Sequence, residues 1–107
     1  MSPIVIALPG SDAHAAELAS RLGAPQLPAE VRRFPDGEIY VRLEGDLRPA
    51  VAGAEVILVG SLTGAGDRFL EVAFLAGAAR DLGARRVGLV APYLAYLRQA
   101  AVRTQLF

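Results

Sequence analysis

The sequence predicts an α/β domain with a mostly parallel sheet, and three observations support this fold class. Short continuous apolar runs, typical of strands buried on both faces of a sheet, occur at Ile4–Leu8, Val56–Val59 and Val87–Ala91. Segments with helical spacing or turn residues separate these runs, as in βαβ units with right-handed crossovers. The length of 107 residues is that of one domain.

A helix is expected directly after the first strand. Pro9-Gly10 ends the apolar run, and Ser11 and Asp12 then supply the chemistry of a helix N-cap. Apolar residues recur at helical spacing on one face: Ala15, Leu18, Ala19 and Leu22. Gly23 is suited to end this helix, because glycine readily takes the left-handed conformation of a C-terminal cap.

Residues 28–44 show the alternation typical of half-exposed strands. The apolar residues of this alternation are Val31, Phe34, Ile39, Val41 and Leu43. Pro35-Asp36-Gly37, in the middle of the segment, is typical of a turn. We therefore expect an antiparallel hairpin that stands partly clear of the core.

A second helix is expected between the second and third core strands. A loop of small residues, Ser61–Gly66, precedes it, and Asp67 is suited to be its N-cap. The helix is expected to end near Leu82, before Gly83. The stripe expected to face the sheet consists of Leu70, Ala73, Phe74, Ala78 and Leu82. Residues 46–54, ahead of the second core strand, are interpreted as a polar connection.

The sequence carries more apolar surface than one sheet-facing stripe requires. Val72, Leu75 and Ala79 widen the apolar surface of the second helix, which indicates a further contact with another helix or with another subunit.

The chain also stops soon after its third core strand, whereas a doubly wound sheet normally continues with a helix and another strand. We therefore expect the chain to be a truncated part of a larger fold.

Composition and charge argue against several classes of protein. The chain has no Cys, which excludes disulfide frameworks, thiolate metal sites and Cys nucleophiles, and the single His14 cannot form a metal cluster alone. All 11 basic residues are Arg, spread from Arg21 to Arg103, and the net charge is zero, which disfavours nucleic-acid binding through a basic face. No apolar run approaches a membrane span and the N-terminus lacks the charged region of a signal peptide, so we expect a cytoplasmic protein.

Ligands of doubly wound sheets bind outside the carboxyl ends of the strands, where three segments of this chain are expected to meet. These segments are Pro9–Asp12, Ser61–Asp67 and Pro92–Gln99. The Ser61–Asp67 loop is small and glycine-rich and leads into a helix, so it could hold an anion or be an ordinary strand-to-helix turn. It matches neither the Walker A motif nor Gly-x-Gly-x-x-Gly.

Two short groups of residues are candidates for binding a nucleotide. Phe34 is expected at the hairpin turn beside Asp36 and Glu38, where the ring could stack on a purine while a carboxylate accepts a hydrogen bond from its amino group. Arg98 and Gln99 follow the third core strand, and Arg is well suited to clamp phosphate. The local chemistry alone also allows plain turn residues at the first place and a solvated surface charge at the second.

Three stretches occur together in the order found in the ribose-phosphate pyrophosphokinase (phosphoribosyl pyrophosphate synthase) family. Val31–Val41 resembles the family's Arg-Phe-Ser/Pro-Asp-Gly-Glu stretch, and Asp46–Arg48 resembles its Asn/Asp-Val-Arg-Gly step. Gly83–Gln99 resembles its stretch of Gly-Ala, an apolar run and Pro-Tyr-x-x-Tyr-x-Arg-Gln. The resemblance is to the N-terminal half of the family's chains and covers nearly all of this chain up to Gln99.

The resemblance implies a three-layer, phosphoribosyltransferase-like (Rossmann-like) α/β fold with a mostly parallel sheet and a protruding antiparallel hairpin. Residues 1–107 would be the N-terminal ATP-binding domain, without the C-terminal domain that binds ribose phosphate. The implied enzyme is a ribose-phosphate diphosphokinase of nucleotide biosynthesis, which converts ATP and ribose 5-phosphate into phosphoribosyl pyrophosphate and AMP. Mg²⁺ would accompany ATP, with its protein ligands outside this chain, and the isolated chain is expected to be inactive. The alternative is a non-catalytic, synthase-associated regulatory protein of the same fold.

The resemblance also implies roles for particular residues. The implied ATP-binding residues are Phe34, Asp36, Glu38, Arg98 and Gln99. The Phe34 ring would stack on adenine, the two carboxylates would read its amino edge, and the Arg-Gln pair would contact the nucleotide from the other side. Because the family's hairpin reaches into a neighbouring subunit's site, a homo-oligomer (dimer or hexamer) is expected. Separately, Arg48 matches an Arg that the family uses at an effector anion site. After Gln99 the chain departs from the family, whose stretch ending in Pro-Gly-Glu has no counterpart here.

Overall fold

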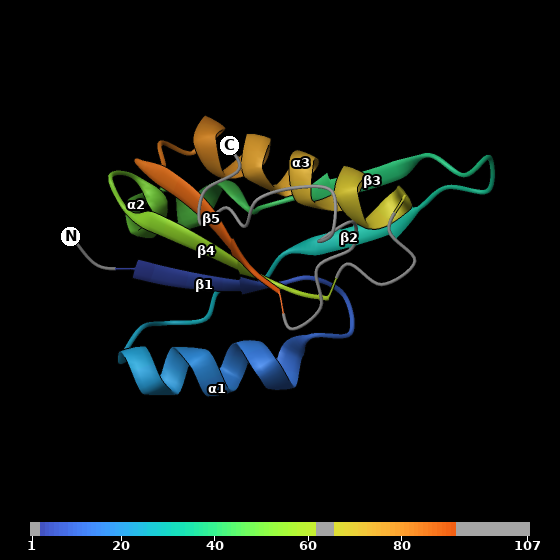
Figure 1. Cartoon of the computed structure of the whole chain (residues 1–107). Coiled ribbons are helices and arrows are strands. Elements are labelled where there is room, and N and C mark those ends of the chain that lie inside the picture. The colour runs from blue at the N-terminus through green and yellow to red at the C-terminus, as the bar shows by residue number, and fades with distance from the viewer. Residues whose placement is uncertain (1–2, 62–65, 92–107) are drawn as a thin grey trace, which may run out of the picture.

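The computed structural model describes residues 3–61 and 66–91, which form an α/β domain of three layers (Figure 1). A parallel sheet in the order β1-β4-β5 forms the middle layer. Its strands are β1 (Pro3–Ala7), β4 (Glu55–Val59) and β5 (Arg86–Val90). Each lies within one residue of an apolar run in the sequence, so the prediction of a parallel sheet built on these runs is confirmed.

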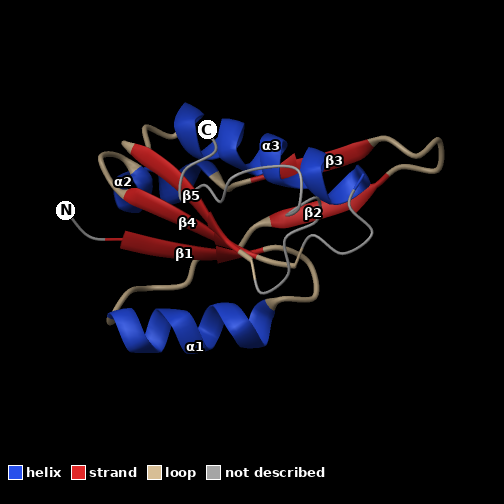
Figure 2. Cartoon of the chain, viewed as in Figure 1, coloured by secondary structure: helices blue, strands red, loops and turns tan. Residues whose placement is uncertain are grey.

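The remaining elements cover the two faces of the sheet or form the hairpin (Figure 2). Helix α1 lies on one face, and the short helix α2 and the long helix α3 lie on the other. Two further strands, β2 and β3, form a separate antiparallel pair. These elements are α1 (Asp12–Leu22), β2 (Glu30–Arg33), β3 (Ile39–Arg42), the 3-10 turn η1 (Gly45–Leu47), α2 (Arg48–Val51) and α3 (Gly66–Asp81).

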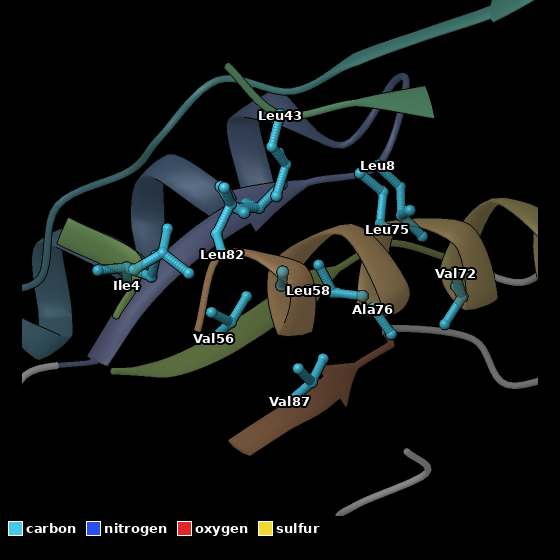
Figure 3. Packing of buried hydrophobic residues seen from close by; sticks show 13 residues of the cluster. Ile4, Leu8, Leu43, Val56, Leu58, Val72, Leu75, Ala76, Leu82 and Val87 are labelled. Atoms are coloured by element: carbon cyan, nitrogen blue, oxygen red, sulfur yellow. The ribbon is translucent and has the colours of Figure 1, made fainter. Parts of the chain in front are cut away.

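The core strands read as continuous apolar runs because both of their faces are buried. On one face, side chains of β1 and β4 such as Ile4, Ile6 and Leu58 pack against α3. Figure 3 shows this cluster closely, with side chains of β4 and α3 directed into the same core. On the other face, Val5 and Val59 pack against α1. Successive residues of a strand point to opposite faces, so a strand covered on both sides consists almost entirely of apolar residues. The charged Glu55 and Arg86 stand at the first positions of β4 and β5, where they pair with each other.

Helix α1 has the predicted bounds but a different N-terminal cap. Ser11 occupies the N-cap position, and its carbonyl accepts a hydrogen bond from the N–H of Ala15, yet its side chain makes no capping hydrogen bond. Gly23 adopts the left-handed conformation (φ 64°) and caps the C-terminus as predicted. The predicted apolar face is confirmed in its middle, where Ala15 and Ala19 are buried, while Leu22 at the end is exposed.

The prediction of which stripe of α3 faces the sheet was wrong for most of its length. Leu70 and Phe74 are 47% and 44% exposed. The buried stripe is formed by Val72, Leu75, Ala76 and Ala79, together with Leu82 just after the helix, which is buried as predicted. Both sides of this helix are apolar, so helical spacing does not distinguish them. The helix also begins by Gly66, so Asp67 lies inside it and not before it.

The connection before β4 contains a short helix that was not predicted. After η1, helix α2 forms a single turn with Pro49 near its start. Its last residue, Val51, is fully buried. A helix of four residues is too short to show a periodic pattern. Proline suits the first turn of a helix, because its missing N–H has no partner there, and this was the available signal.

The β2–β3 hairpin is confirmed, and one of its faces packs against α3. Val31 pairs with Val41, and both contact the main core from the inner face. Figure 1 shows the turn of the hairpin extending away from the sheet. Every residue from 34 to 38 is exposed, as predicted for a hairpin that stands partly clear of the core. Among the described residues, no helix is long and apolar enough to cross a membrane.

Candidate functional site

The turn of the hairpin is held by its own backbone and by one carboxylate. The N–H of Phe34 donates to the carbonyl of Glu38 and the N–H of Gly37 donates to the carbonyl of Phe34, both at 2.8 Å. Asp36 Oδ1 accepts from the N–H of Glu38 at 3.0 Å. Gly37 has a φ of 93°, which favours glycine. The turn residues proposed to contact a ligand therefore also define the shape of the turn.

The outer face of the hairpin carries an aromatic pair topped by a cation. Phe34 is 44% exposed, and its ring meets the ring of Tyr40 edge to face, with centroids 5.8 Å apart and planes at 69°. The guanidinium of Arg32 lies over the Tyr40 ring at 5.0 Å. Contact with Tyr40 restrains the Phe34 ring while much of it stays open to a planar ligand.

Charges of both signs flank the aromatic pair. Arg32 pairs with Glu30 at 2.9 Å, and Arg42 pairs with Glu44 at 3.3 Å. The pKa of Arg42 is raised above its ordinary value, first by hydrogen bonding to Tyr40 and then by the charge of Glu44. The mixed charge of this face is unlike the uniformly basic face of a nucleic-acid-binding domain.

A buried carboxylate that was not singled out in the sequence attaches the hairpin to α3, at the end of β2 that leads into the turn. Glu71 is 7% exposed and pairs with Arg68 at 2.8 Å and with Arg33 at 3.5 Å. Arg68 also donates to the carbonyl of Pro9 at 2.7 Å, at the carboxyl end of β1. A lone Glu inside the apolar sequence of a helix was the available signal.

The structure brings some of the predicted site residues together. Phe34, Asp36 and Glu38 lie on one turn and are all exposed. Arg48, expected at an effector anion site, starts α2, and its Nη1 donates to the carbonyl of Asp81 at the end of α3, at 3.2 Å. Arg98 and Gln99 lie outside the described residues, as does most of the loop 61–67. In the described part of the chain, no three His, Cys, Asp or Glu side chains are grouped as a metal site requires.

A shallow groove of about 480 Å³ lies between β3 and α3. Ile39, Tyr40 and Val41 form one wall of the groove. The other wall is the exposed side of α3, including Phe74 and the small residues around it. The groove lies next to the aromatic pair of the hairpin. The residues that the sequence indicated as a second contact, Val72, Leu75 and Ala79, are instead buried in the core beneath α3.

Comparison with known proteins places these features in one family. Residues 4–105 match the family model of the N-terminal domain of ribose phosphate pyrophosphokinase. The ribose-phosphate pyrophosphokinase of Thermoplasma acidophilum is 36% identical over 95 residues, covering 89% of this chain and 32% of the relative. That of Thermococcus kodakarensis is 41% identical over 81 residues, covering 75% of this chain and 27% of the relative. The chain therefore spans about a third or less of the length of these curated relatives.

Two solved structures have the same fold at low sequence identity. Phosphoribosylpyrophosphate synthetase from Mycobacterium smegmatis superposes with a TM-score of 0.75 at 22% identity, over 92% of this chain and 32% of that one. Purine phosphoribosyltransferase from Pyrococcus horikoshii superposes with a TM-score of 0.60 at 17% identity, over 88% and 64%. The expected three-layer, phosphoribosyltransferase-like α/β fold is thus confirmed. By its match to the N-terminal domain model and to these curated relatives, the chain belongs to the ribose-phosphate pyrophosphokinase family.

Proposed function

We propose that this chain is the ATP-binding N-terminal half of a ribose-phosphate diphosphokinase, an enzyme of nucleotide biosynthesis in the cytoplasm. The complete enzyme would transfer the pyrophosphate of ATP to the 1-hydroxyl of ribose 5-phosphate and release AMP. The observation that carries the proposal is the exposed Phe34 ring beside two carboxylates on a turn of fixed shape. Because the chain spans about a third of its relatives, ribose 5-phosphate would be bound by parts of the enzyme outside it.

The turn offers a purine both a stacking surface and hydrogen-bond acceptors. The Phe34 ring would stack on adenine, a contact worth about 1–3 kcal/mol per base. Asp36 Oδ1 is engaged by the N–H of Glu38, which leaves the second oxygen of Asp36 and the carboxylate of Glu38 to accept from the amino group of adenine. These acceptors would favour adenine over a base with a carbonyl group at that position.

A complete nucleotide site would need a second copy of the chain. In our proposal Arg98 and Gln99 contact the nucleotide from the side opposite Phe34 and come from a neighbouring subunit. Two observations support a homo-oligomer, either a dimer or a hexamer: the turn extends away from its own sheet, and Leu70 and Phe74 leave an apolar side of α3 exposed. The Arg48 guanidinium remains a candidate for an effector anion, beside the end of α3.

The described residues do not fit a magnesium site of their own. Mg²⁺ prefers several oxygen ligands in octahedral geometry. Within residues 3–61 and 66–91, which the structure describes, no three carboxylate or imidazole side chains are grouped. One oxygen of Asp36 is moreover used within the turn. We propose that Mg²⁺ enters with the ATP phosphates and, as the resemblance to the family implies, has its protein ligands outside this chain.

Titration calorimetry with ATP tests the proposal directly. Phe34→Ala should weaken ATP binding by about 5- to 150-fold, the equivalent of a lost stacking contact of about 1–3 kcal/mol. The control is Leu22→Ala, which removes an equally exposed apolar side chain from the end of α1, on the other face of the sheet, and should leave ATP affinity unchanged. Absence of ATP binding, or equal affinities of the Phe34→Ala variant and the parent chain, would contradict the proposal.

A non-catalytic regulatory protein of the same fold is the second candidate, favoured by the departure from the family pattern after Gln99. It predicts association with a complete synthase and an ATP affinity that does not depend on Phe34. Neither candidate gives the isolated chain activity of its own. An assay for AMP release with ATP, ribose 5-phosphate and Mg²⁺ should therefore show no turnover, and measurable turnover would contradict both.

A further inference from the structure

Glu71 differs from the other charged residues whose side chains are described, because it is buried. It is 7% exposed, whereas the paired residues Glu17 and Arg21 on α1 have side chains that are 63% and 75% exposed. Exposed ion pairs contribute little, because water screens them. A buried carboxylate has lost its hydration and depends on the partners around it. We therefore expect that removing the charge of Glu71 affects the structure around it more than removing the charge of an exposed residue would.

The two oxygens of Glu71 engage two arginines from different segments. Oε1 lies 2.8 Å from Nη1 of Arg68, one turn earlier on α3. Oε2 lies 3.5 Å from Nη2 of Arg33, the last residue of β2. The other Nη of Arg68 donates to the carbonyl of Pro9 at 2.7 Å. Glu71 thus connects the hairpin, α3 and the loop after β1 in one network.

The network is anchored next to the candidate site without forming part of it. Arg33 directly precedes Phe34, and successive side chains of a strand point to opposite faces. Arg33 therefore points inward to Glu71 while Phe34 points outward with Tyr40. At its other end, the network reaches Pro9 at the carboxyl edge of the sheet, where α/β folds of this kind bind ligands. Removing the charge of Glu71 would take away the carboxylate that the guanidinium groups of Arg33 and Arg68 share.

We propose that Glu71 is a positioning residue that fixes the angle of the hairpin turn against the carboxyl edge of the sheet. Nucleotide affinity then depends on Glu71, although Glu71 does not touch the nucleotide. This inference rests on the proposed function, because it takes Phe34 as the ligand-contacting group through which Glu71 acts. It also makes a claim about the free chain: the hairpin should become mobile when the charge is removed, whether or not nucleotide is present.

A double-mutant cycle in the full chain separates positioning from general support of the fold. Glu71→Gln keeps the shape of the side chain and should weaken ATP binding about tenfold, within the range of coupling between contacting residues. In the Phe34→Ala background the same substitution should cost clearly less, because the stacking ring is gone and only the carboxylates of Asp36 and Glu38 remain to be positioned. Equal losses in both backgrounds, or no loss in either, would overturn the proposal. Glu17→Gln, the same change in the exposed pair of α1, should leave affinity unchanged.

Hydrogen exchange without nucleotide tests the structural half of the proposal independently. In the Glu71→Gln variant, the amides of Phe34 and Gly37 should exchange about tenfold faster while those of β1, β4 and β5 keep their protection. Equal acceleration throughout the sheet would show general destabilisation and overturn the proposal. If the parent chain binds no ATP, the proposed function fails while this measurement still decides the role of Glu71. Should the Glu71→Gln variant not fold, Arg33→Gln removes the ion pair between the hairpin and Glu71 and must give the same pattern of exchange.

Discussion

The central sheet and the β2–β3 hairpin differ in how many of their faces are buried. In β4, Val56, Leu58 and Val59 are buried, because α1 covers one face of the sheet and α3 the other. In the hairpin, every residue from 30 to 42 is half-buried or exposed, because only its inner face has a partner. The comparison teaches that stability is concentrated in the sheet, whereas the hairpin can place aromatic and charged groups in solvent at little cost to the core.

The same deletion in the two regions should therefore have very different effects. Ile6 of β1 is fully buried, so Ile6→Ala should lower the free energy of unfolding by about 2–5 kcal/mol. Ile39 of β3 is half-buried beside the groove, so Ile39→Ala should lower it by only about 1 kcal/mol. Urea unfolding followed by circular dichroism measures both. Equal losses would break the comparison, because they would place the hairpin in the same cooperative core as the sheet.

A methyl group added beside the sheet should have the next largest effect. A Cβ on Gly60, which follows β4, would overlap Cδ1 of the fully buried Leu8 and lie 2.6 Å from its Cβ. Gly60→Ala should therefore lower the free energy of unfolding by about 1–3 kcal/mol through overpacking. Gly77→Ala on the exposed side of α3 is the control: nothing lies within 4 Å of its Cβ, and a gain of about 0.5–1 kcal/mol is expected from helix propensity.

The two regions also differ in how well the sequence predicted them. The strands of the sheet were placed within one residue, because burial on both faces leaves a continuous apolar run. The hairpin was identified by its alternation and its turn residues, Pro35-Asp36-Gly37. The buried side of α3 could not be chosen, since both of its sides are apolar and the choice between Phe74 and Leu75 is made by packing against the sheet. Helix α2 was not predicted, because a helix of one turn is too short to show the repeat of apolar residues that identifies a helix.

The candidate site divides in the same way between local and tertiary information. Phe34, Asp36 and Glu38 are neighbours in the sequence, so a single turn brings them together and the motif could be found by inspection. The network of Arg33, Glu71 and Pro9 joins three distant segments, and nothing short of the folded chain shows that they meet. Tyr40 is intermediate: the alternation predicts its outward face, whereas its contact with Phe34 follows from the register of the hairpin.

The smallest expected effect is confined to the outer face of the hairpin and shows how far its aromatic pair stabilises it. Arg32→Gln removes the guanidinium from the Tyr40 ring and also breaks the pair with Glu30. An exposed cation–π contact is worth about 0.5–1 kcal/mol, so the amides that pair β2 with β3 should exchange about two- to fivefold faster.

Glu30→Gln breaks the same ion pair but leaves Arg32 over the ring, and it should have less effect, because exposed ion pairs contribute little. If the two variants accelerate exchange equally, the ion pair stabilises the hairpin and the ring contact contributes nothing. If exchange in β1, β4 and β5 rises as well, the hairpin opens only with the sheet, and the distinction between a stable layer and a separately mobile hairpin fails.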